Sequence, residues 1–418
     1  MKKHKSYLKA SEQLIALIIA FVLVVNLVPV QVQAEVVMEH APVTVYLDSY
    51  YENTYQELTV GEYDIDALEA GVGNDEISSI RIAQGYQVTL YTNSGFAGNA
   101  VVLTQDELNF KNLGINDEVS SLKIEQINPV DGTCIQISGW TDAEKVQIMQ
   151  NYAPRIWMAE GEVYWPSSVE YALPYLTRTW DDTNGYYYYA TTEPLADPET
   201  KLNYFAGNIN SAKCYSFWVE KDYNNVDISY FQFCPYNYGK KVLGMEFGNH
   251  VGDWEHITIR FAKFTYNGVD YMKPIQVRYP THSFASEYNW ADVEKVEGTH
   301  LVGYSAEGSH GMWKDAGDHE YQNIVIAKLT DECSAGTAWN TWTCLETYEY
   351  SALTRTGRGL GSTEWKTYFD VDYQNADSLS VYEWGNKKNG SVFGQDKLGN
   401  GPTGPQEKWA LSHYTKFD

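Results

Sequence analysis

The sequence has few cysteines and few basic residues, and each shortage excludes a class of protein. None of the Cys-x-x-Cys spacings of zinc ribbons occurs among the five cysteines, which excludes a structural zinc site of that kind. Lys and Arg number 30 against 55 Asp and Glu, so the formal net charge is −25. A chain this acidic repels nucleic acid and anionic lipid headgroups and attracts cations. We therefore expect no nucleic-acid partner.

Long apolar runs are also scarce, and the one that occurs lies near the start. Four lysines precede residues 14–25, which are mostly apolar, and residues 32–34 offer a small-residue cleavage pattern. This layout is typical of a secretory signal peptide, so we expect residues 1–34 to be removed and the mature protein to be secreted. An uncleaved membrane anchor is the alternative. No later segment approaches the ~18 apolar residues of a membrane helix, and we expect no transmembrane segment after cleavage.

The cysteines suggest disulfides if the protein reaches an oxidising compartment. Cys214 and Cys234 flank an aromatic segment, and Cys333 and Cys344 flank a short loop. We expect these two pairs to form disulfides, with Cys134 left over, although several other pairings are open.

The chain length of 418 residues suits two domains better than one. Residues 43–127 alternate in short strand-like runs separated by turn residues, without an amphipathic helix. Two similar halves begin at residues 43 and 88. Each half later carries the same six-residue turn, at residues 74–79 and 116–121, followed by a short strand. The first domain is therefore an internal duplication.

The repeated turn resembles the calcium signature of βγ-crystallins, Asn/Asp-Asn/Asp-any-any-Ser/Thr-Ser, and both copies fit it at every position. The aromatic-plus-glycine corner of that family is also matched by Tyr91, Phe96 and Gly98. In the first half Asn53 takes the glycine place, and Asn tolerates positive φ. The resemblance implies a calcium-binding double Greek-key sandwich over residues 36–128.

The turn chemistry suits calcium, which takes six to eight oxygen ligands. The resemblance implies hydroxyl ligands from the fifth residue of each turn and main-chain oxygens near the third, while the first two residues shape and charge the loop. The residues concerned are Asn74, Asp75, Glu76 and Ser78 in the first turn and Asn116, Asp117, Glu118 and Ser120 in the second. The alternative is a pair of Asx-turns without metal.

The remaining sequence predicts a larger β-rich domain. Residues 129–149 form a linker that leads into a short helix at about 141–152. Residues 150–418 are dense in Tyr and Trp and contain strand-like runs. Their glycine-rich turns lack the strand and helix context of a phosphate-binding loop. The expected fold class is mainly β, with the βγ-crystallin-type sandwich followed by this domain.

Two carboxylates stand at the start of a predicted strand within residues 249–261. At strand periodicity Asp253 and Glu255 share one face with apolar residues, and His250 enters just before them. Carboxylates on such a face need a cation or a hydrogen-bond network. We expect a second divalent-metal site formed by these three residues, or a division of acid and base roles between them.

A buried salt bridge is the alternative explanation of these carboxylates, with Arg260 or Arg278 as the counter-ion. His282 and His310 are further candidates for the pocket because both follow strand-like runs. Ser309 and His310 are no catalytic dyad, since adjacent residues point apart and no nucleophile elbow is present.

Several segments of the second domain resemble the vacuolar protein sorting-associated protein 62 family, in the family's order. They are residues 153–157, 164–170, 230–237, 250–256, 308–310 and 384–405. The resemblance implies a domain of this family over residues 150–418 and no particular catalytic activity. Residues 250–255 are also similar to the Gly-His-Arg-His-Asp-Trp-Glu motif of secreted necrosis-inducing proteins, which lines a divalent-metal pocket. Gly252 stands where that motif has its second His.

These observations predict a secreted calcium-binding protein whose second domain engages a glycan or lipid ligand at a cell surface or on an extracellular polymer. One alternative is a metal-dependent hydrolase with Glu255 as general base and Asp253 as the other candidate catalytic residue. The other is a structural matrix or coat protein. The sequence does not decide whether the protein is an enzyme.

Overall fold

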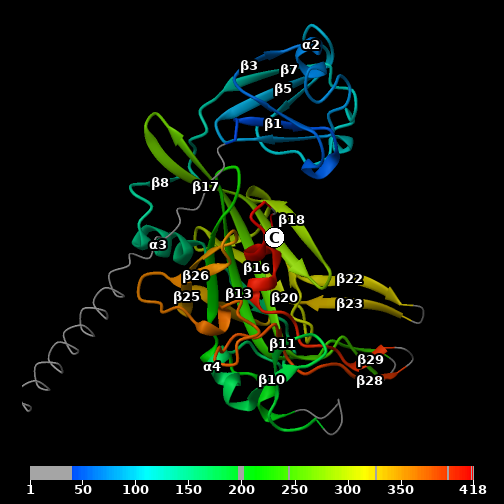
Figure 1. Cartoon of the computed structure of the whole chain (residues 1–418), viewed down its shortest axis with the longest axis vertical. Coiled ribbons are helices and arrows are strands. Elements are labelled where there is room, and N and C mark those ends of the chain that lie inside the picture. Colours follow the sequence, from blue (N-terminus) through cyan, green and yellow to red (C-terminus); the bar gives the residue numbers. More distant parts are fainter. Residues whose placement is uncertain are drawn as a thin grey trace, which may run out of the picture. The chain divides into compact units, whose positions relative to one another are not determined.

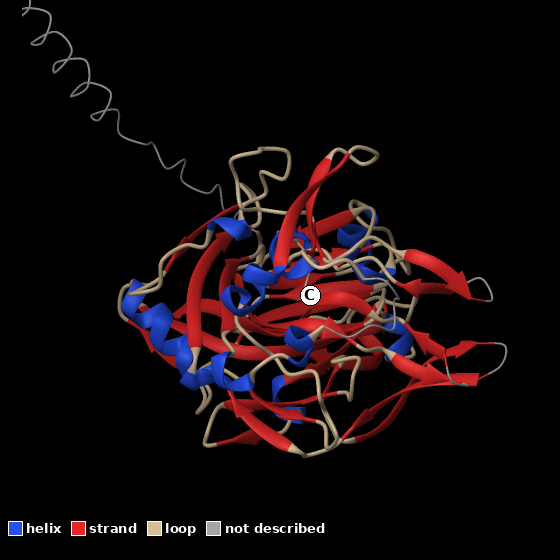
Figure 2. Ribbon diagram, turned by 90° about the horizontal axis from the view of Figure 1, so that it is seen from below, coloured by secondary structure: helices blue, strands red, loops and turns tan. Residues whose placement is uncertain are grey.

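The computed structural model describes residues 40–195, 202–242, 245–324, 327–392, 395–415 and 417. The expected signal peptide, residues 1–34, lies outside the described residues. The fold is mainly β, as predicted, and strands predominate over helices in Figure 2. Across the described segments, none of the helices is both long and apolar enough to cross a membrane.

The first part of the described chain is a sandwich of two antiparallel sheets (Figure 1). One sheet has the order β2-β1-β4 and the other the order β3-β7-β5-β6. The bounds are β1 Val43–Tyr46, β2 Tyr55–Leu58, β3 Gly61–Tyr63, β4 Ser79–Ile82, β5 Tyr86–Asn93, β6 Ala97–Leu103 and β7 Ser121–Gln126, with the short helix α2 at Ile65–Glu69. Strand β3 of the first half pairs with β7 of the second, and Ile80 bridges to Glu107 in return. Each half therefore contributes to both sheets, which is the Greek-key crossing.

The two halves repeat one another in detail, which confirms the predicted duplication. Val88 and Leu90 of β5 alternate into a core that is built from residues 43–124 alone. The backbone N–H of Ser78 donates to Tyr46 and that of Ser120 to Tyr91, both at 3.0 Å.

The strand corners agree with the sequence as well. Asn53 has a φ of 62° and Gly98 a φ of 82°. The first corner therefore has Asn at the position where the second corner has Gly.

The segment after the sandwich contains β8 (Ile135–Ile137) and α3 (Asp142–Tyr152). The helix predicted at 141–152 is thus confirmed, with Thr141 as its N-cap. The Thr141 hydroxyl accepts from the N–H of Glu144 at 3.3 Å, and the Glu144 carboxylate accepts from the N–H of Thr141 at 3.0 Å. This capping box begins the helix where the sequence places it.

The second part is organised on a long central sheet with the order β18-β17-β16-β13-β12-β25-β26, to which β8 adds beside β17. The bounds are β12 Cys214–Glu220, β13 Asn225–Asn237, β16 His250–Tyr266, β17 Val269–Thr281, β18 Phe284–Asn289, β25 Leu345–Ser351 and β26 Thr356–Gly359. Ile257 and Ile259 of β16 belong to one apolar cluster and Val251 and Trp254 to another. Both faces of the sheet are therefore covered, and its central strands are buried along their length.

Smaller sheets and hairpins surround the central sheet. One has the order β19-β20-β9-β24 with β21 beside β20, another the order β10-β11-β27, and the pairs β14-β15, β22-β23 and β28-β29 are hairpins. The strands are β9 Arg155–Met158, β10 Leu176–Asp181, β11 Tyr186–Thr191, β14 Lys240–Val242, β15 Met245–Phe247, β19 Lys295–Val296, β20 His300–Ser305, β21 Met312–Trp313, β22 Gly317–Ile324, β23 Ala327–Cys333, β24 Thr337–Asn340, β27 Glu383–Trp384, β28 Asn389–Val392 and β29 Gln395–Leu398; the short helices are α4 Val169–Ala172 and α5 Trp409–Ser412.

The predicted disulfides are absent from the described structure, in which all five cysteines are free thiols. Cys333 packs in a small cluster near β20, whereas Cys344 packs against the central-sheet core. Cys214 lies beside Cys344, to whose carbonyl its N–H donates at 3.2 Å. Cys234 lies next to His310 instead of Cys214. The predicted pairs are not formed. Strands β12 and β13 are neighbours, but their pairing runs only to Tyr215 and Phe231, and Cys234 lies beyond it, opposite Asp253 of β16.

We predict that Gly252→Ala destabilises the protein by about 2–4 kcal/mol, measured by urea denaturation. Gly252 has a φ of 70°, which costs an L-residue about 1–2 kcal/mol, and a Cβ here would lie 1.8 Å from the carbonyl oxygen of Trp384. Gly185 is a matched control, since its φ is 75° but nothing lies within 4 Å of a Cβ. Gly185→Ala should therefore cost only the backbone strain. Equal losses in the two variants would contradict the packing argument.

Candidate functional site

The two repeated turns of the sandwich lie against each other, and their side chains pair crosswise. The Ser120 hydroxyl donates to Oδ1 of Asp75 at 2.7 Å, and the Ser78 hydroxyl donates to Oδ1 of Asp117 at 3.0 Å. The backbone N–H of Asp75 also donates to the carbonyl of Val119 at 3.3 Å. Each carboxylate of one turn is thus held next to the hydroxyl of the other.

Both aspartates adopt a left-handed backbone with φ of 56°, which Asp and Asn tolerate better than most residues. Nδ2 of Asn74 donates to Oδ2 of Asp75 at 2.9 Å, and Nδ2 of Asn116 to Oδ2 of Asp117 at 2.7 Å. The other amide oxygen, Oδ1 of Asn74 and of Asn116, is buried and accepts no hydrogen bond from the described residues. A buried acceptor without a partner costs about 1–3 kcal/mol.

This donor set fits calcium. Each crossed pair offers a carboxylate and a hydroxyl, and a buried amide oxygen without a donor lies in each turn. Oxygen ligands of these types are the ones that calcium prefers. Six of the eight predicted residues form these contacts, all except Glu76 and Glu118, and the arrangement differs from a site within each single turn. Because the duplicated halves face each other, Asp75 belongs with Ser120 and Asp117 with Ser78.

The second candidate site begins with the register of the central sheet. Strand β13 pairs with β16 so that Gln232 lies opposite Glu255 and Cys234 opposite Asp253. Strand β16 is continuous, so Asp253 and Glu255 share a face, as the sequence predicts. Both line one cavity of about 620 Å³ together with His250. The structure therefore brings the three predicted residues to one place.

The same cavity contains residues from distant parts of the chain. Its other lining residues are Asn237, Gly239, Gly248, His282, Ser283, Ser309, Tyr321, Gln322, Leu329, Pro402 and Lys408. Of these, the sequence predicted only His282. Lys408 lies more than 150 positions after Glu255 in the sequence, and no local pattern distinguishes it from other surface lysines.

His310 lies behind the cavity and pairs with Asp253. Its Nδ1 is 2.8 Å from Oδ2 of Asp253, and its Nε2 is 2.9 Å from the carbonyl oxygen of Tyr164. Both partners only accept, so both ring nitrogens donate and the imidazole is cationic. Burial opposes this charge, but Cys234, Asp253 and Glu162 hold the pKa of His310 well above its usual range. His310 and Asp253 form a buried ion pair.

Neither predicted arginine is the counter-ion of Asp253. Arg260 donates twice to Asp227, at 2.7 and 2.8 Å, and Arg278 donates to Glu287 at 2.6 Å. Both arginines lie where β16 and β17 are already paired. The salt bridge proposed as the alternative explanation does exist, but its cation is His310.

The two carboxyl groups carry different charges. Burial raises the pKa of Asp253, but the hydrogen bond from His310 outweighs it and holds this pKa below its usual range. Burial, together with repulsion from Asp253, raises the pKa of Glu255 well above its usual range. Asp253 is therefore the carboxyl that stays ionised at neutral pH, and Glu255 is the one that more readily takes up a proton.

His250 is neutral and oriented by two neighbours. Burial lowers its pKa, its Nδ1–H donates to the carbonyl of Gly252 at 2.6 Å, and its Nε2 accepts from Nδ2 of Asn237 at 2.9 Å. The lone pair that a metal would need is already used.

A divalent ion does not fit this donor set. The Asp253 carboxylate is bonded to a buried cation, Glu255 is protonated and the His250 lone pair is engaged. In the part of the chain that the structure describes, no group of three or more His, Cys, Asp and Glu is arranged to hold a metal. Gly252 also explains the departure from the necrosis-inducing motif, since a side chain there would collide with Trp384. We derive no metal chemistry at this site.

Comparison with known proteins finds matches in both the first and the second part of the chain. Residues 181–324 match the model of the vacuolar protein sorting-associated protein 62 family. The chain contains a domain of this family. His250, Asp253, Glu255, His282 and His310 all lie within the matched residues. The family resemblance predicted from scattered segments is thus confirmed, while the predicted domain bounds, residues 150–418, stay a prediction.

Individual relatives match separate parts of the chain. Vacuolar protein sorting-associated protein 62 of Saccharomyces cerevisiae is 30% identical over 152 residues, covering 33% of this chain and 31% of that protein. The development-specific protein S homolog of Myxococcus xanthus is 33% identical over 89 residues, covering 21% of this chain and 49% of that protein. The chain therefore spans about a third of the yeast relative and about half of the bacterial one.

A solved βγ-crystallin domain from Flavobacterium johnsoniae is similar to a short part of the chain. It is 38% identical, and the match covers 22% of this chain and 99% of that domain with a TM-score of 0.20.

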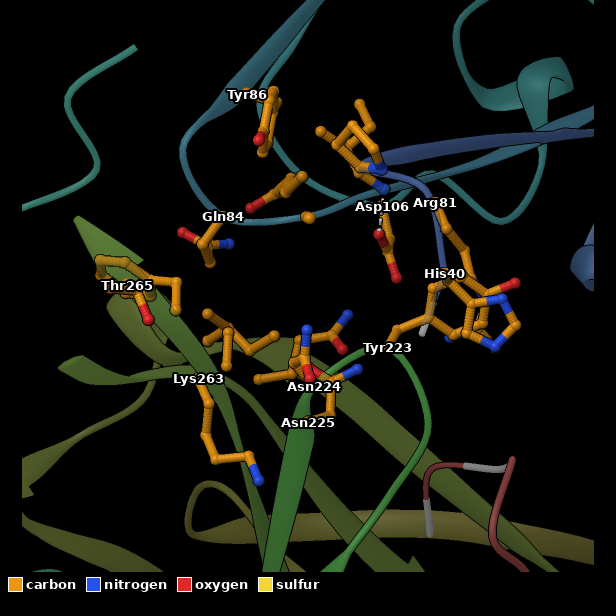
Figure 3. A pocket seen from close by; sticks show the side chains of 18 residues that line it. His40, Arg81, Gln84, Tyr86, Asp106, Tyr223, Asn224, Asn225, Lys263 and Thr265 are labelled. Atoms are coloured by element: carbon orange, nitrogen blue, oxygen red, sulfur yellow. Dashed lines mark hydrogen bonds between the residues drawn. The ribbon is translucent and has the colours of Figure 1, made fainter. Parts of the chain in front are cut away.

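A further pocket of about 300 Å³ lies outside the family-domain cavity (Figure 3). Arg81 and Asp106 line it together with Tyr223. Asp106 accepts from the backbone N–H of Ile82 at 2.7 Å, and burial raises its pKa against the pull of Arg81. The sequence predicted none of these residues as functional.

We predict that Asp253→Asn destabilises the protein by about 3–5 kcal/mol at neutral pH, because it leaves the His310 cation buried without its partner. Glu62 is a control, since its 2.7 Å pair with Lys123 is solvent-exposed. Glu62→Gln should cost less than about 1 kcal/mol. Urea denaturation of both variants measures the difference.

The pH dependence of this difference follows from the lowered pKa of Asp253. A depressed carboxyl pKa contributes stability that is complete above about pH 4 and is lost as pH falls through the folded-state pKa. Below about pH 4, where Asp253 takes up a proton, the stability gap between the wild type and Asp253→Asn should therefore narrow. The raised pKa of His310 acts at higher pH, where its contribution to stability is lost as pH rises. A gap that does not narrow below about pH 4 would contradict the assigned charges.

Proposed function

We propose that this is an extracellular calcium-binding protein whose Greek-key module is stabilised by calcium and whose family domain binds an uncharged polar ligand, a glycan of a cell surface or an extracellular polymer. The observation that carries the calcium proposal is the crossed pairing of Ser120 with Asp75 and Ser78 with Asp117. The resemblance to secreted proteins and the expected signal peptide support an extracellular location.

The balance of charges in the cavity supports a neutral ligand. Asp253 is neutralised from behind by His310, and Glu255 carries its own proton. The lining is otherwise rich in uncharged donors and acceptors, including Asn237, Ser283 and Gln322. Hydroxyl groups of a sugar match such a set, because each can both donate and accept. Lys408 adds an ammonium group to the lining, whereas a metal ion would need a free carboxylate, and Asp253 is already paired with His310.

Two other functions, a structural role and a hydrolase, are the alternatives to this one. A structural matrix or coat role requires only the calcium module and a closed salt bridge, whereas here an open cavity lies beside the Asp253–His310 pair. A hydrolase is favoured by one observation, the opposite protonation states of Asp253 and Glu255, which is the pattern of acid–base sites. Such a hydrolase would use the carboxyl of Glu255 as an acid.

We predict that calcium titration by calorimetry shows about two binding events, and that saturating calcium raises the melting temperature. At a hundredfold excess over Kd each site adds about 2.7 kcal/mol of stability. The crossed arrangement predicts which double variants remove ligands from one calcium site and which remove ligands from both. Asp75→Asn with Ser120→Ala should leave one binding event intact, whereas Asp75→Asn with Ser78→Ala should remove both.

The two double variants serve as controls for each other, since each removes one carboxylate and one hydroxyl. The reverse result, with one event left in Asp75→Asn/Ser78→Ala, would show that each site lies within a single turn. No heat and no rise in melting temperature for the intact protein would refute the calcium proposal.

We predict that a glycan array detects binding by the intact protein and that Ser283→Trp weakens this binding at least tenfold. Ser283 is exposed at the cavity, so an indole there obstructs the entrance without disturbing the core. Ser94→Trp is the control at an exposed serine of the first module. Binding only to lipid vesicles, or glycan binding that both variants retain equally, would contradict the proposed ligand site.

A further inference from the structure

A second cavity meets the first at a small group of polar residues. It has a volume of about 320 Å³ and lies where β16 and β17 separate, because their pairing begins only at Thr258 and Arg278. The two cavities share four lining residues, which are Glu255, His282, Ser283 and Lys408. A carboxyl, an imidazole and an ammonium group therefore line both cavities, which together are called the cleft here.

His282 is held at this junction by Asp331. Nε2 of His282 is 2.9 Å from Oδ2 of Asp331, a buried carboxylate that also accepts from Ser309 at 2.5 Å and from Nε1 of Trp313 at 3.0 Å. Because a carboxylate only accepts, Nε2 carries the proton and Nδ1 has the lone pair. The ring also stacks on Tyr321 at 3.7 Å between centroids. Its orientation is thus determined from two sides.

The remaining nitrogen of His282 is available for chemistry. Nδ1 accepts no hydrogen bond from the described residues, and the side chain is 25% exposed toward the cleft. His282 also has a φ of 50°, a backbone conformation that is uncommon for this residue type and is concentrated at functional sites. An imidazole oriented by a buried carboxylate, with its second nitrogen open to a cleft, has the arrangement of a general base.

We propose that the cleft hydrolyses a carboxylic ester carried by a polyhydroxylated ligand, with His282 as the base, Asp331 as its positioning residue, Lys408 as the oxyanion partner and Glu255 as the acid. This inference rests on the proposed ligand site and adds a reaction to it. No protein nucleophile is needed, because the base acts on water.

The reaction balances without any further reactant. Nδ1 of His282 takes a proton from water as the water oxygen bonds to the acyl carbon, and the carbonyl oxygen becomes an oxyanion beside the Lys408 ammonium. The ester C–O bond then breaks, and the leaving alkoxide takes the proton of Glu255. Proton transfer from His282 to Glu255 through solvent restores the starting state. The products are a carboxylic acid and an alcohol.

The charges of the site favour an ester over a glycosidic bond. Cleavage of a glycosidic bond passes through a cationic sugar that a free carboxylate stabilises, but the carboxylate of Asp253 is already paired with His310. Cleavage of an ester passes through an anion instead, for which the ammonium of Lys408 is the appropriate partner.

The test measures acetate release from peracetylated glucose and colour release from 4-nitrophenyl acetate by the intact chain. His282→Gln should lower kcat/KM at least 100-fold on both, in line with the loss of a general base. His300→Gln is the matched control, since His300 also stacks on an aromatic ring, Trp342 at 3.8 Å, and bonds to a backbone carbonyl outside the cleft. It should retain full activity.

Two further variants separate chemistry from folding. Asp331→Asn should lower kcat with KM unchanged, because it disturbs the tautomer and orientation of His282. Glu255→Gln should slow the sugar acetate far more than 4-nitrophenyl acetate, because nitrophenolate leaves without a proton whereas an alkoxide does not.

The outcomes distinguish this inference from the proposed function. No hydrolysis by the wild type, or equal activity in His282→Gln and His300→Gln, overturns the hydrolytic inference. Glycan binding retained in His282→Gln then leaves the proposed function standing. If the intact protein binds no glycan, the proposed function itself is refuted, whatever the esterase result.

Discussion

The antiparallel pairing of β13 with β16 is the constraint on which the second site depends. It sets Cys234 opposite Asp253 and Gln232 opposite Glu255, and both faces of the sheet around it are buried. A slip of one residue would exchange the two faces of β16, which would bury the carboxyl groups among aromatic rings and turn Trp254 toward the cavity. The close contact of Gly252 with Trp384 holds the start of the strand in this register.

Burying the ion pair of Asp253 and His310 costs solvation free energy, and further hydrogen bonds to His310 offset part of that cost. The second ring nitrogen of His310 bonds to the carbonyl of Tyr164, and Glu162 lies 3.8 Å away. Glu162 is in turn held by the N–H of Gly308 at 2.7 Å. A buried ion pair adds little net stability over an apolar core. Its effect here is to determine the charge of the cavity, because it leaves Glu255 as the carboxyl that must take a proton.

The calcium turns show how a duplicated sequence builds a shared site. The carboxylate and the hydroxyl of each pair come from residues 45 and 39 positions apart. Neither half holds a complete pair alone, so a cation bound there would link the two halves. The family domain shows the same principle at larger separation, since His310 and Asp253 are 57 positions apart and His282 and Asp331 are 49 apart.

The local sequence pattern was enough to predict those features of this protein that depend on residues close together in the sequence. The alternation of β5 and β16, the capping box of Thr141 and the two repeated turns could all be read from the residues, because period and capping are properties of short segments. The family resemblance was recognisable from motifs in order, and the candidate residues lie in or beside one cavity: His250, Asp253, Glu255 and His282 line it, and His310 bonds to Asp253 behind it. Only tertiary structure decided what these residues do. The crossed Ser–Asp pairs, the choice of His310 over the arginines, the free thiols and the orientation of His282 by Asp331 follow from which strands lie side by side, and no local pattern encodes contacts between residues so far apart.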